Sequence, residues 1–275
     1  MKIVKNCHES LPQMATGSLL GLVVENGVLE VTHAFPSPDS GKDDEIDEDF
    51  QLEMMRMLRE VNVDNNCVGW YQSMYLGIYS TSSVLETQFS YQTDLSPNAV
   101  VLLYDPLQTA HGQFCLKAFR LSDEALMMKE NDSNDFIKPG NLFEELPVTC
   151  TNPKLANALM LDYSAKSDIA LDRLDLSTHP YLEKHLELMC GWVDELAQEQ
   201  HKFQYYTRGL GRGSNKRAAG WASPDAPKRL ESLLLTNQIE SYCNQVDKFA
   251  GGGLSKLFLA GGLHKEDRSS NAAES

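Results

Sequence analysis

Every run of this sequence that has the pattern of a β-strand lies before residue 152. Two β-rich runs, 17–24 and 28–35, are separated by Glu-Asn-Gly, and Asn-Gly between such runs is typical of a hairpin. Further strand patterns are found at 67–74, 99–105, 113–121 and 146–150. Helical patterns are found at 1–10, 50–61 and 80–91, the last opened by a Ser or Thr cap. Because helices and strands alternate, we predict an α/β (α+β) domain with a central β-sheet flanked by helices.

After residue 152 the apolar residues recur at helical spacing instead. A helix is expected from 152 to about 163, followed by a polar linker at 164–177 and a long helix. The run 209–227 is rich in Gly, Ser and Pro, which is typical of a flexible linker. A last helix is expected to be interrupted at Gly251-Gly252-Gly253. The predicted organisation is a first domain at 1–151, a helical extension at 152–208, a linker at 209–227, a bundle helix at 228–265 and a disordered tail at 266–275.

The two long helices each carry a stripe of apolar residues that needs a packing partner. Either the two stripes pair with each other, or they join a bundle supplied by other chains, which is the alternative that we favour. The predicted partner-packing residues are Leu182, Leu186, Met189, Val193, Leu196, Phe203, Leu235, Ile239, Tyr242, Val246 and Phe249.

Composition excludes several classes of protein. The formal net charge of −15 argues against a protein that coats nucleic acid, and no specific DNA partner is expected. The acidic run 39–49 predicts a solvated loop. No apolar run approaches the ~20 residues of a membrane span, so we expect no membrane partner. The six cysteines include no CxxC pair, which is the pattern of small buried apolar side chains rather than of a disulfide framework.

Residues 68–85 carry the most informative motif. A strand ending in Val68-Gly69-Trp70-Tyr71-Gln72-Ser73-Met74 is followed after seven residues by a Ser-led helix. This arrangement resembles the JAMM region of MPN-type, metalloprotease-like domains, which reads H-x-H-x7-S-x2-D in active members. There the two His and the Asp bind zinc, and an upstream Glu is the general base. Three ligands leave a fourth position open for a water whose pKa falls to about 7.

The resemblance places four of the five functional positions on residues that cannot perform this chemistry. The general-base position is Met14, the two His positions are Gln72 and Met74, and the Asp position is Leu85, whereas Ser82 is retained. Carboxamide, thioether and isobutyl groups do not replace imidazole and carboxylate as zinc ligands. The histidines form no H-x-H or H-E-x-x-H elsewhere, and no G-x-S-x-G is present. We therefore predict a non-catalytic domain with no catalytic, metal-binding or cofactor-binding residues and no cofactor.

Segments along the whole chain also resemble one family, the h subunits of the eukaryotic translation initiation factor three complex. These segments are LLGLVVENGVLEVTHAFPSP, QLEMMRMLREVNVDNNCVGWYQS, LLYDPLQTAHGQFCLKAFRLS, ELAQEQHKFQYYTR and RLESLLLTNQIESYC. From the comparison with that family, we expect the N-terminal strand to be shortened or missing. The resemblance implies a cytoplasmic scaffold whose MPN domain pairs with a second MPN protein, the f subunit. It also implies C-terminal helices that join a bundle with PCI-domain subunits, and binding to the small ribosomal subunit during initiation.

Two other functions remain as alternatives at this point. Inactive MPN scaffolds also occur in the proteasome lid and the signalosome, and the identity of the partners would discriminate them. A zinc deubiquitinase is the enzyme alternative, and near-stoichiometric zinc in purified protein would support it.

Overall fold

The structure of the chain is a computed structural model. It describes residues 1–273 apart from 25–26, 39–43, 62–65, 111–113, 131–137, 153, 156, 159–178 and 214–228. No helix within the described ranges is long and apolar enough to cross a membrane.

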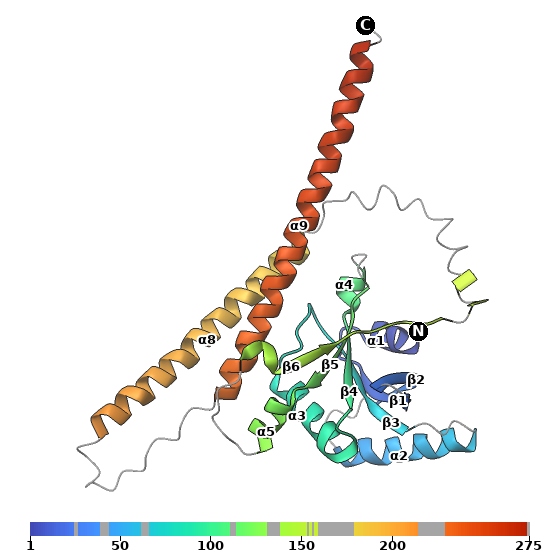
Figure 1. The fold of residues 1–275 in the computed structure, drawn as a ribbon, viewed down its shortest axis with the longest axis vertical. Coiled ribbons are helices and arrows are strands. Elements are labelled where there is room, and N and C mark those ends of the chain that lie inside the picture. Colours follow the sequence, from blue (N-terminus) through green and yellow to red (C-terminus); the bar gives the residue numbers. More distant parts are fainter. Residues whose placement is uncertain are drawn as a thin grey trace. The chain divides into compact units, whose positions relative to one another are not determined.

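The N-terminal part contains one mixed six-stranded sheet with the strand order β2-β1-β3-β4-β5-β6 (Figure 1). Neighbouring strands are antiparallel except for β3 and β4, which are parallel. The strands are β1 (Thr16–Val24), β2 (Val28–Pro36), β3 (Asn66–Ser73), β4 (Val100–Tyr104), β5 (Leu116–Leu121) and β6 (Phe143–Leu146). The predicted α+β fold with a central sheet is confirmed.

The first two strands form the predicted hairpin, in which Val24 pairs with Val28. Gly27 has a φ of +75°, a left-handed conformation that glycine adopts without the steric penalty of a Cβ atom. The Asn-Gly signal therefore predicts the connection correctly, although residues 25–26 lie outside the described part of the chain.

The strand β3 approaches its neighbours very closely at Gly69. Its register against β1 shifts at this point, because Leu19 pairs with Gly69 whereas Leu20 pairs with Cys67. A Cβ atom on Gly69 would lie 1.9 Å from the carbonyl oxygen of Val100 on β4, so only glycine fits here. This bulge sets the alignment of the C-terminal half of β3, where the motif residues lie.

Helices cover both faces of the sheet. On one face, α1 (Lys2–Glu9) packs Ile3, Val4 and Cys7 into an apolar cluster that includes Tyr71 and Tyr104. Burial raises the pKa of Tyr71 to about 12, and its oxygen accepts a 2.9 Å hydrogen bond from the Asn6 amide. The opposite face is covered by α3 (Ser82–Ser90), α5 (Asp123–Glu130) and the first turns of α9 (Arg229–Ala273).

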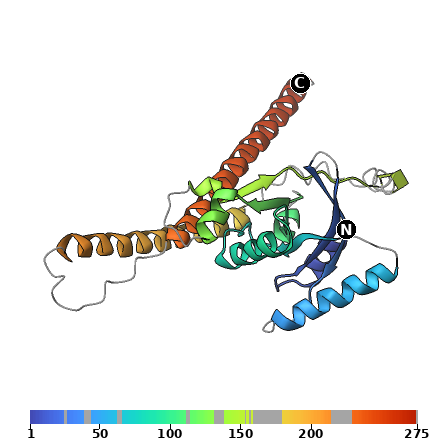
Figure 2. The same cartoon turned by 60° about the horizontal axis from the view of Figure 1, so that its bottom comes forward.

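The helix α2 (Asp44–Glu60) lies alongside the β1–β2 end of the sheet (Figure 2). Phe50 packs edge-on against Phe35, and the Gln51 amide donates a hydrogen bond of 2.7 Å to Ser18. The predicted loop 39–49 is wrong from Asp44 onward, since α2 begins there. Carboxylates near a helix N-terminus interact favourably with the helix dipole, which explains why an acidic run can start a helix.

The last strand and several short elements of the first domain differ from the prediction. The final strand is predicted at 146–150 but is β6, which ends at Leu146 before Pro147. Proline has no N–H group with which to continue a strand ladder. The helix α5 is not among the predicted elements. The remaining short elements are the π-helical turn η2 (Tyr91–Leu95), α4 (Pro106–Ala110) and the 3-10 turn η3 (Pro139–Asn141).

The C-terminal part is helical, with α8 (His179–Gly213) and α9 (Figure 1). The predicted linker 209–227 is wrong for its first five residues, because α8 continues to Gly213; 214–227 lies outside the described residues. The expected interruption at 251–253 is wrong, because α9 runs unbroken to Ala273. This helix also includes 266–273 of the segment that was expected to be a disordered tail, and 274–275 lie outside the described residues. Glycine costs only about 1 kcal/mol relative to alanine in a helix, which long flanking turns can offset. The expected helix at 152–163 and linker at 164–177 lie mostly outside the described residues.

The chain divides into two compact units, and each of them is discontinuous in sequence. Unit 1 contains Met1–Val148 together with Lys202–Gln238, and unit 2 contains Thr149–His201 together with Ile239–Ser275. The first ten residues of α9 therefore belong to the same unit as the sheet.

Candidate functional site

Two of the positions expected at a metal site meet where β1 begins and β3 ends. Gln72 on β3 is paired with Thr16, and its amide nitrogen lies 3.2 Å from the sulfur of Met14, to which it donates a weak hydrogen bond. Two shorter contacts hold the same strands together. The Ser73 hydroxyl accepts from the Ala15 amide at 2.8 Å, and the Ser73 amide donates to the Ala15 carbonyl at 2.8 Å. The structure thus brings the general-base position and the first His position side by side.

The second His position and the Asp position lie in the hydrophobic core. The side chains of Met74 and Leu85 are only 3% and 2% exposed, and both belong to the apolar cluster that includes Trp70 and Val101. Ser82 is exposed at the first position of α3, one residue after Thr81, whose hydroxyl accepts a hydrogen bond from Val84 N and caps the helix. The predicted cap is confirmed.

These residues do not fit a zinc ion. Their polar donors are limited to a thioether, a carboxamide and a hydroxyl, whereas zinc takes imidazole, thiolate or carboxylate ligands. An ionised ligand at position 74 or 85 would also lack solvation in the apolar cluster. Across the described ranges, no group of three or more His, Cys, Asp or Glu side chains is arranged to hold a metal ion.

The connection between β3 and α3 is held by a buried carboxylate from the next strand. Leu76 and Gly77 both have positive φ angles, 52° and 74°. The Gly77 amide donates a 2.8 Å hydrogen bond to Asp105, which is fully buried directly after β4. The second oxygen of Asp105 accepts from the amides of Leu107 and Gln108 at 2.9 and 3.0 Å, capping α4. Asp105 is not among the site residues predicted from the sequence, although an Asp before a Pro-led helix is a recognisable capping signal.

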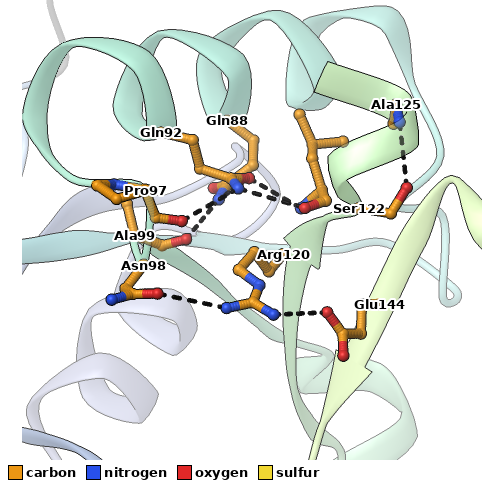
Figure 3. Close-up of polar contacts among 10 residues, drawn as sticks. Gln88, Gln92, Pro97, Asn98, Ala99, Arg120, Ser122, Ala125 and Glu144 are labelled. Atoms are coloured by element: carbon orange, nitrogen blue, oxygen red, sulfur yellow. Dashed lines mark hydrogen bonds and ion pairs between the residues drawn. The ribbon is translucent and has the colours of Figure 1, made fainter. Parts of the chain in front are cut away.

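Two buried glutamines fix α3 and η2 to the sheet (Figure 3). Gln88 accepts a 2.9 Å hydrogen bond from the indole of Trp70 and donates to the Ala99 carbonyl at 2.8 Å and to Gln92 at 3.0 Å. Gln92 in turn accepts from the amide of Leu121 on β5 at 2.8 Å. At the edge of this region Figure 3 also shows Arg120 between Asn98 and Glu144, the latter at 2.7 Å. The helix α3, which follows β3, is therefore anchored through amide groups.

The predicted stripes of α8 and α9 are only partly available for partners. In unit 2, Tyr242 is fully buried, and its ring centroid lies 4.8 Å from that of His185 and 4.5 Å from that of Trp192. At this point the two helices pair with each other, which is the less favoured of the two alternatives that the sequence leaves open. Burial lowers the pKa of His185 to about 4. In unit 1, Arg229 stacks over the ring of Phe203 at 5.2 Å.

The other stripe positions range from half-buried to exposed. Leu186 and Val193 are exposed, and the side chains of Leu182 and Phe249 lie outside the described residues. The half-buried members are Met189, Leu196, Leu235, Ile239 and Val246.

The most exposed apolar side chains of α9 lie beyond the predicted stripe. Phe258 is 81% exposed, and Leu254 and Leu257 are each more than half exposed. These three residues are spaced i, i+3, i+4 and therefore share one face of the helix. Leu259 is also exposed but points about 100° away from Phe258 around the helix axis. The sequence carries this signal in LSKLFLAGGL, but the preceding glycines obscure the continuous helix.

Comparison with known proteins agrees with this architecture. Residues 1–97 match the family described as JAB1/Mov34/MPN/PAD-1 ubiquitin protease, so the sheet and its helices form an MPN domain. Residues 109–219 and 221–269 match the family described as the C-terminal region of eIF3h.

Full-length relatives identify the family. In an alignment 305 positions long, the chain is 38% identical to the H subunit of eukaryotic translation initiation factor 3 from Arabidopsis thaliana. The alignment covers 96% of this chain and 90% of the relative. It is 37% identical to the H subunit from Dictyostelium discoideum, covering 96% and 92%, and 37% identical to the H-A subunit from Danio rerio, covering 96% and 90%. The chain belongs to the family of H subunits of eukaryotic translation initiation factor 3. The predicted resemblance to this family is confirmed.

Proposed function

We propose that the chain is a non-catalytic scaffold subunit of the initiation factor 3 complex. In this proposal it acts in the cytoplasm, its MPN domain pairs with the MPN domain of the f subunit, and its C-terminal helices join PCI-domain subunits in a bundle. Through these contacts it supports binding of the complex to the small ribosomal subunit. Membership of the H-subunit family is the observation that carries this proposal.

The chemistry of the former metal site supports the non-catalytic part. Met74 and Leu85 are core residues, and Gln72 contacts the thioether of Met14 rather than an ionisable group. Hydrolysis of an isopeptide bond by a metalloprotease needs a bound water of lowered pKa and a carboxylate to take its proton. Neither group is supplied by the residues at these positions.

The exposed face of α9 supports the assembly part. Leu254, Leu257 and Phe258 form an apolar stripe on a 45-residue helix, about 67 Å long. A helix lowers its free energy by laying such a face into a groove or bundle. The stripe residues are therefore the ones on which we expect other subunits to pack.

Purification of the tagged chain from native extract, with identification of the co-purifying proteins, tests the assembly proposal. We expect subunits of initiation factor 3 and proteins of the small ribosomal subunit in the eluate. The double substitution Leu254→Asp with Phe258→Asp should reduce the recovery of other subunits about tenfold or more, because it desolvates two charges in an apolar interface. The matched control is Leu259→Asp, on a different face of the same helix, which should leave recovery near that of the unsubstituted chain.

Two results would contradict the proposal. Recovery of proteasome-lid or signalosome subunits instead would mean that the chain is a scaffold of another assembly. If the double variant recovered as much of the other subunits as the unsubstituted chain does, the face of Leu254, Leu257 and Phe258 would not be the assembly surface. For the non-catalytic part, purified protein should contain far less than one zinc per chain and should not cleave ubiquitin dimers; stoichiometric zinc with cleavage would overturn it.

A further inference from the structure

The first turns of α9 make polar contacts with the 77–80 turn that follows β3. Gln238 is only 2% exposed, and its side-chain oxygen accepts hydrogen bonds from the amides of Tyr79 at 3.1 Å and Ser80 at 2.9 Å. Its side-chain nitrogen donates to the Gly77 carbonyl at 3.1 Å. A single side chain thereby satisfies three backbone groups of a four-residue turn.

A second set of contacts extends this junction. The Ser80 hydroxyl donates to the Leu234 carbonyl at 2.9 Å and accepts from the Asn237 amide at 3.3 Å. The Leu234 side chain is 4% exposed and belongs to the same apolar cluster as Met74 and Leu85. The junction therefore has a polar half and an apolar half, as an interior domain contact does.

The turn itself needs such support. The backbone enters it through two successive residues with positive φ angles, Leu76 and Gly77. Leu76, directly before the turn, is not glycine and is strained in this conformation. The amides of Tyr79 and Ser80 are buried in the junction, and a buried amide without an acceptor is costly. One oxygen atom of Gln238 accepts from both of these amides, so both depend on the position of α9.

We propose that residues 229–238 of α9 are a structural ligand of the MPN domain, and that Gln238 fixes the conformation of the 77–80 turn. This segment of α9 thereby connects the end of β3 to the start of α3, by binding the turn between them. The MPN domain is complete only with this segment bound, and the inference does not depend on which subunits the chain assembles with.

Amide hydrogen exchange of the full chain tests this proposal. The variant Gln238→Met keeps the length and packing of the side chain but removes its polar atoms. We expect the amides of Tyr79 and Ser80 to exchange about tenfold faster or more, because each loses its acceptor. The amides of β4 should change less than about twofold. The matched control is Asn244→Met, which replaces an exposed carboxamide on the same helix and should change neither set.

The result can also go against the proposal. Unchanged exchange of the Tyr79 and Ser80 amides in Gln238→Met would overturn it. If the β4 amides exchanged faster by the same factor as those of Tyr79 and Ser80, the proposal would also be overturned, because Gln238 would then contribute only to global stability. A milder cycle of Ser80→Ala, Asn237→Ala and the double variant guards against misfolding. If the junction holds the turn, the effect of the double variant on the exchange rate of the Ser80 amide differs by about threefold or more from the product of the two single effects. A double effect equal to that product would contradict the proposal.

Discussion

His185 makes the packing of the C-terminal helices dependent on pH. Its ring is fully buried against Tyr242, and burial lowers its pKa to about 4, compared with about 6.5 in an unfolded chain. Between these two values the unfolded chain binds a proton that the folded chain excludes. Stability from this group is therefore fully present above about pH 6.5 and decreases as the pH falls toward 4.

The size of the effect follows from the two pKa values. At pH 5 the unfolded side chain is almost fully protonated and the folded one is mostly neutral, so folding is less favourable by about 2 kcal/mol than at pH 7.5. The substitution His185→Phe keeps an aromatic ring next to Tyr242 and removes the titration. When the pH falls from 7.5 to 5, we therefore expect His185→Phe to lose about 2 kcal/mol less of its free energy of unfolding than the original chain loses.

Urea unfolding at pH 7.5 and pH 5.0, followed by circular dichroism, measures this difference directly. The control substitution is His201→Phe, at an exposed position of the same helix. It reports any general effect of adding a phenyl group to α8. If His185→Phe loses as much stability between the two pH values as the original chain does, the reasoning from burial is refuted.

Two further substitutions test the interior and the long helix. Gln88→Leu removes the acceptor of the Trp70 indole, so we expect the free energy of unfolding to fall by about 3 kcal/mol in thermal melts; a loss below about 0.5 kcal/mol would show that the amide network is not stabilising. Gly253→Ala on α9 meets no atom within 4 Å of its new Cβ, so we expect stability to rise by up to about 1 kcal/mol, measured as higher helix content and melting temperature. A loss of helix with alanine would contradict a continuous α9.

Local signals explain most of what could be predicted for the first domain. The Asn-Gly pair, the alternating strands and the Ser/Thr cap are short-range chemistry, and they predict the hairpin, the sheet and α3. The predictions for the acidic start of α2 and the triple glycine of α9 are wrong because they consider the composition of each run alone. The helix dipole favours carboxylates at the start of α2, and the long flanking turns of α9 offset the low helix propensity of glycine.

The junction at Gln238 could not be predicted for a different reason. Its packed positions are the partly buried Leu230 and the buried Leu234, Asn237 and Gln238. They do follow helical spacing, but two of the four are polar. A search for apolar residues at helical spacing therefore selects the adjacent stripe of α9, which begins at Leu235 and Ile239. For the candidate site, the sequence predicts both Met14 and Gln72 as site positions. They meet because Gln72 lies on β3 and Met14 lies just before β1, the strand that pairs with β3. It does not reveal that Met74 and Leu85 are core residues, since burial depends on what packs above them.

The discontinuous first unit has a consequence for synthesis of the chain. Val148 and Gln238 are 90 residues apart, and the ribosome adds about 5 to 20 residues per second. The nascent sheet therefore waits about 5 to 20 seconds before Leu234 and Gln238 are even polymerised. During this interval the apolar surface that Leu234 will cover is open to chaperones or to other nascent chains. A premature stop codon anywhere before residue 229 would make that exposure permanent, so such truncated products should be cleared by quality control rather than accumulate as isolated MPN domains.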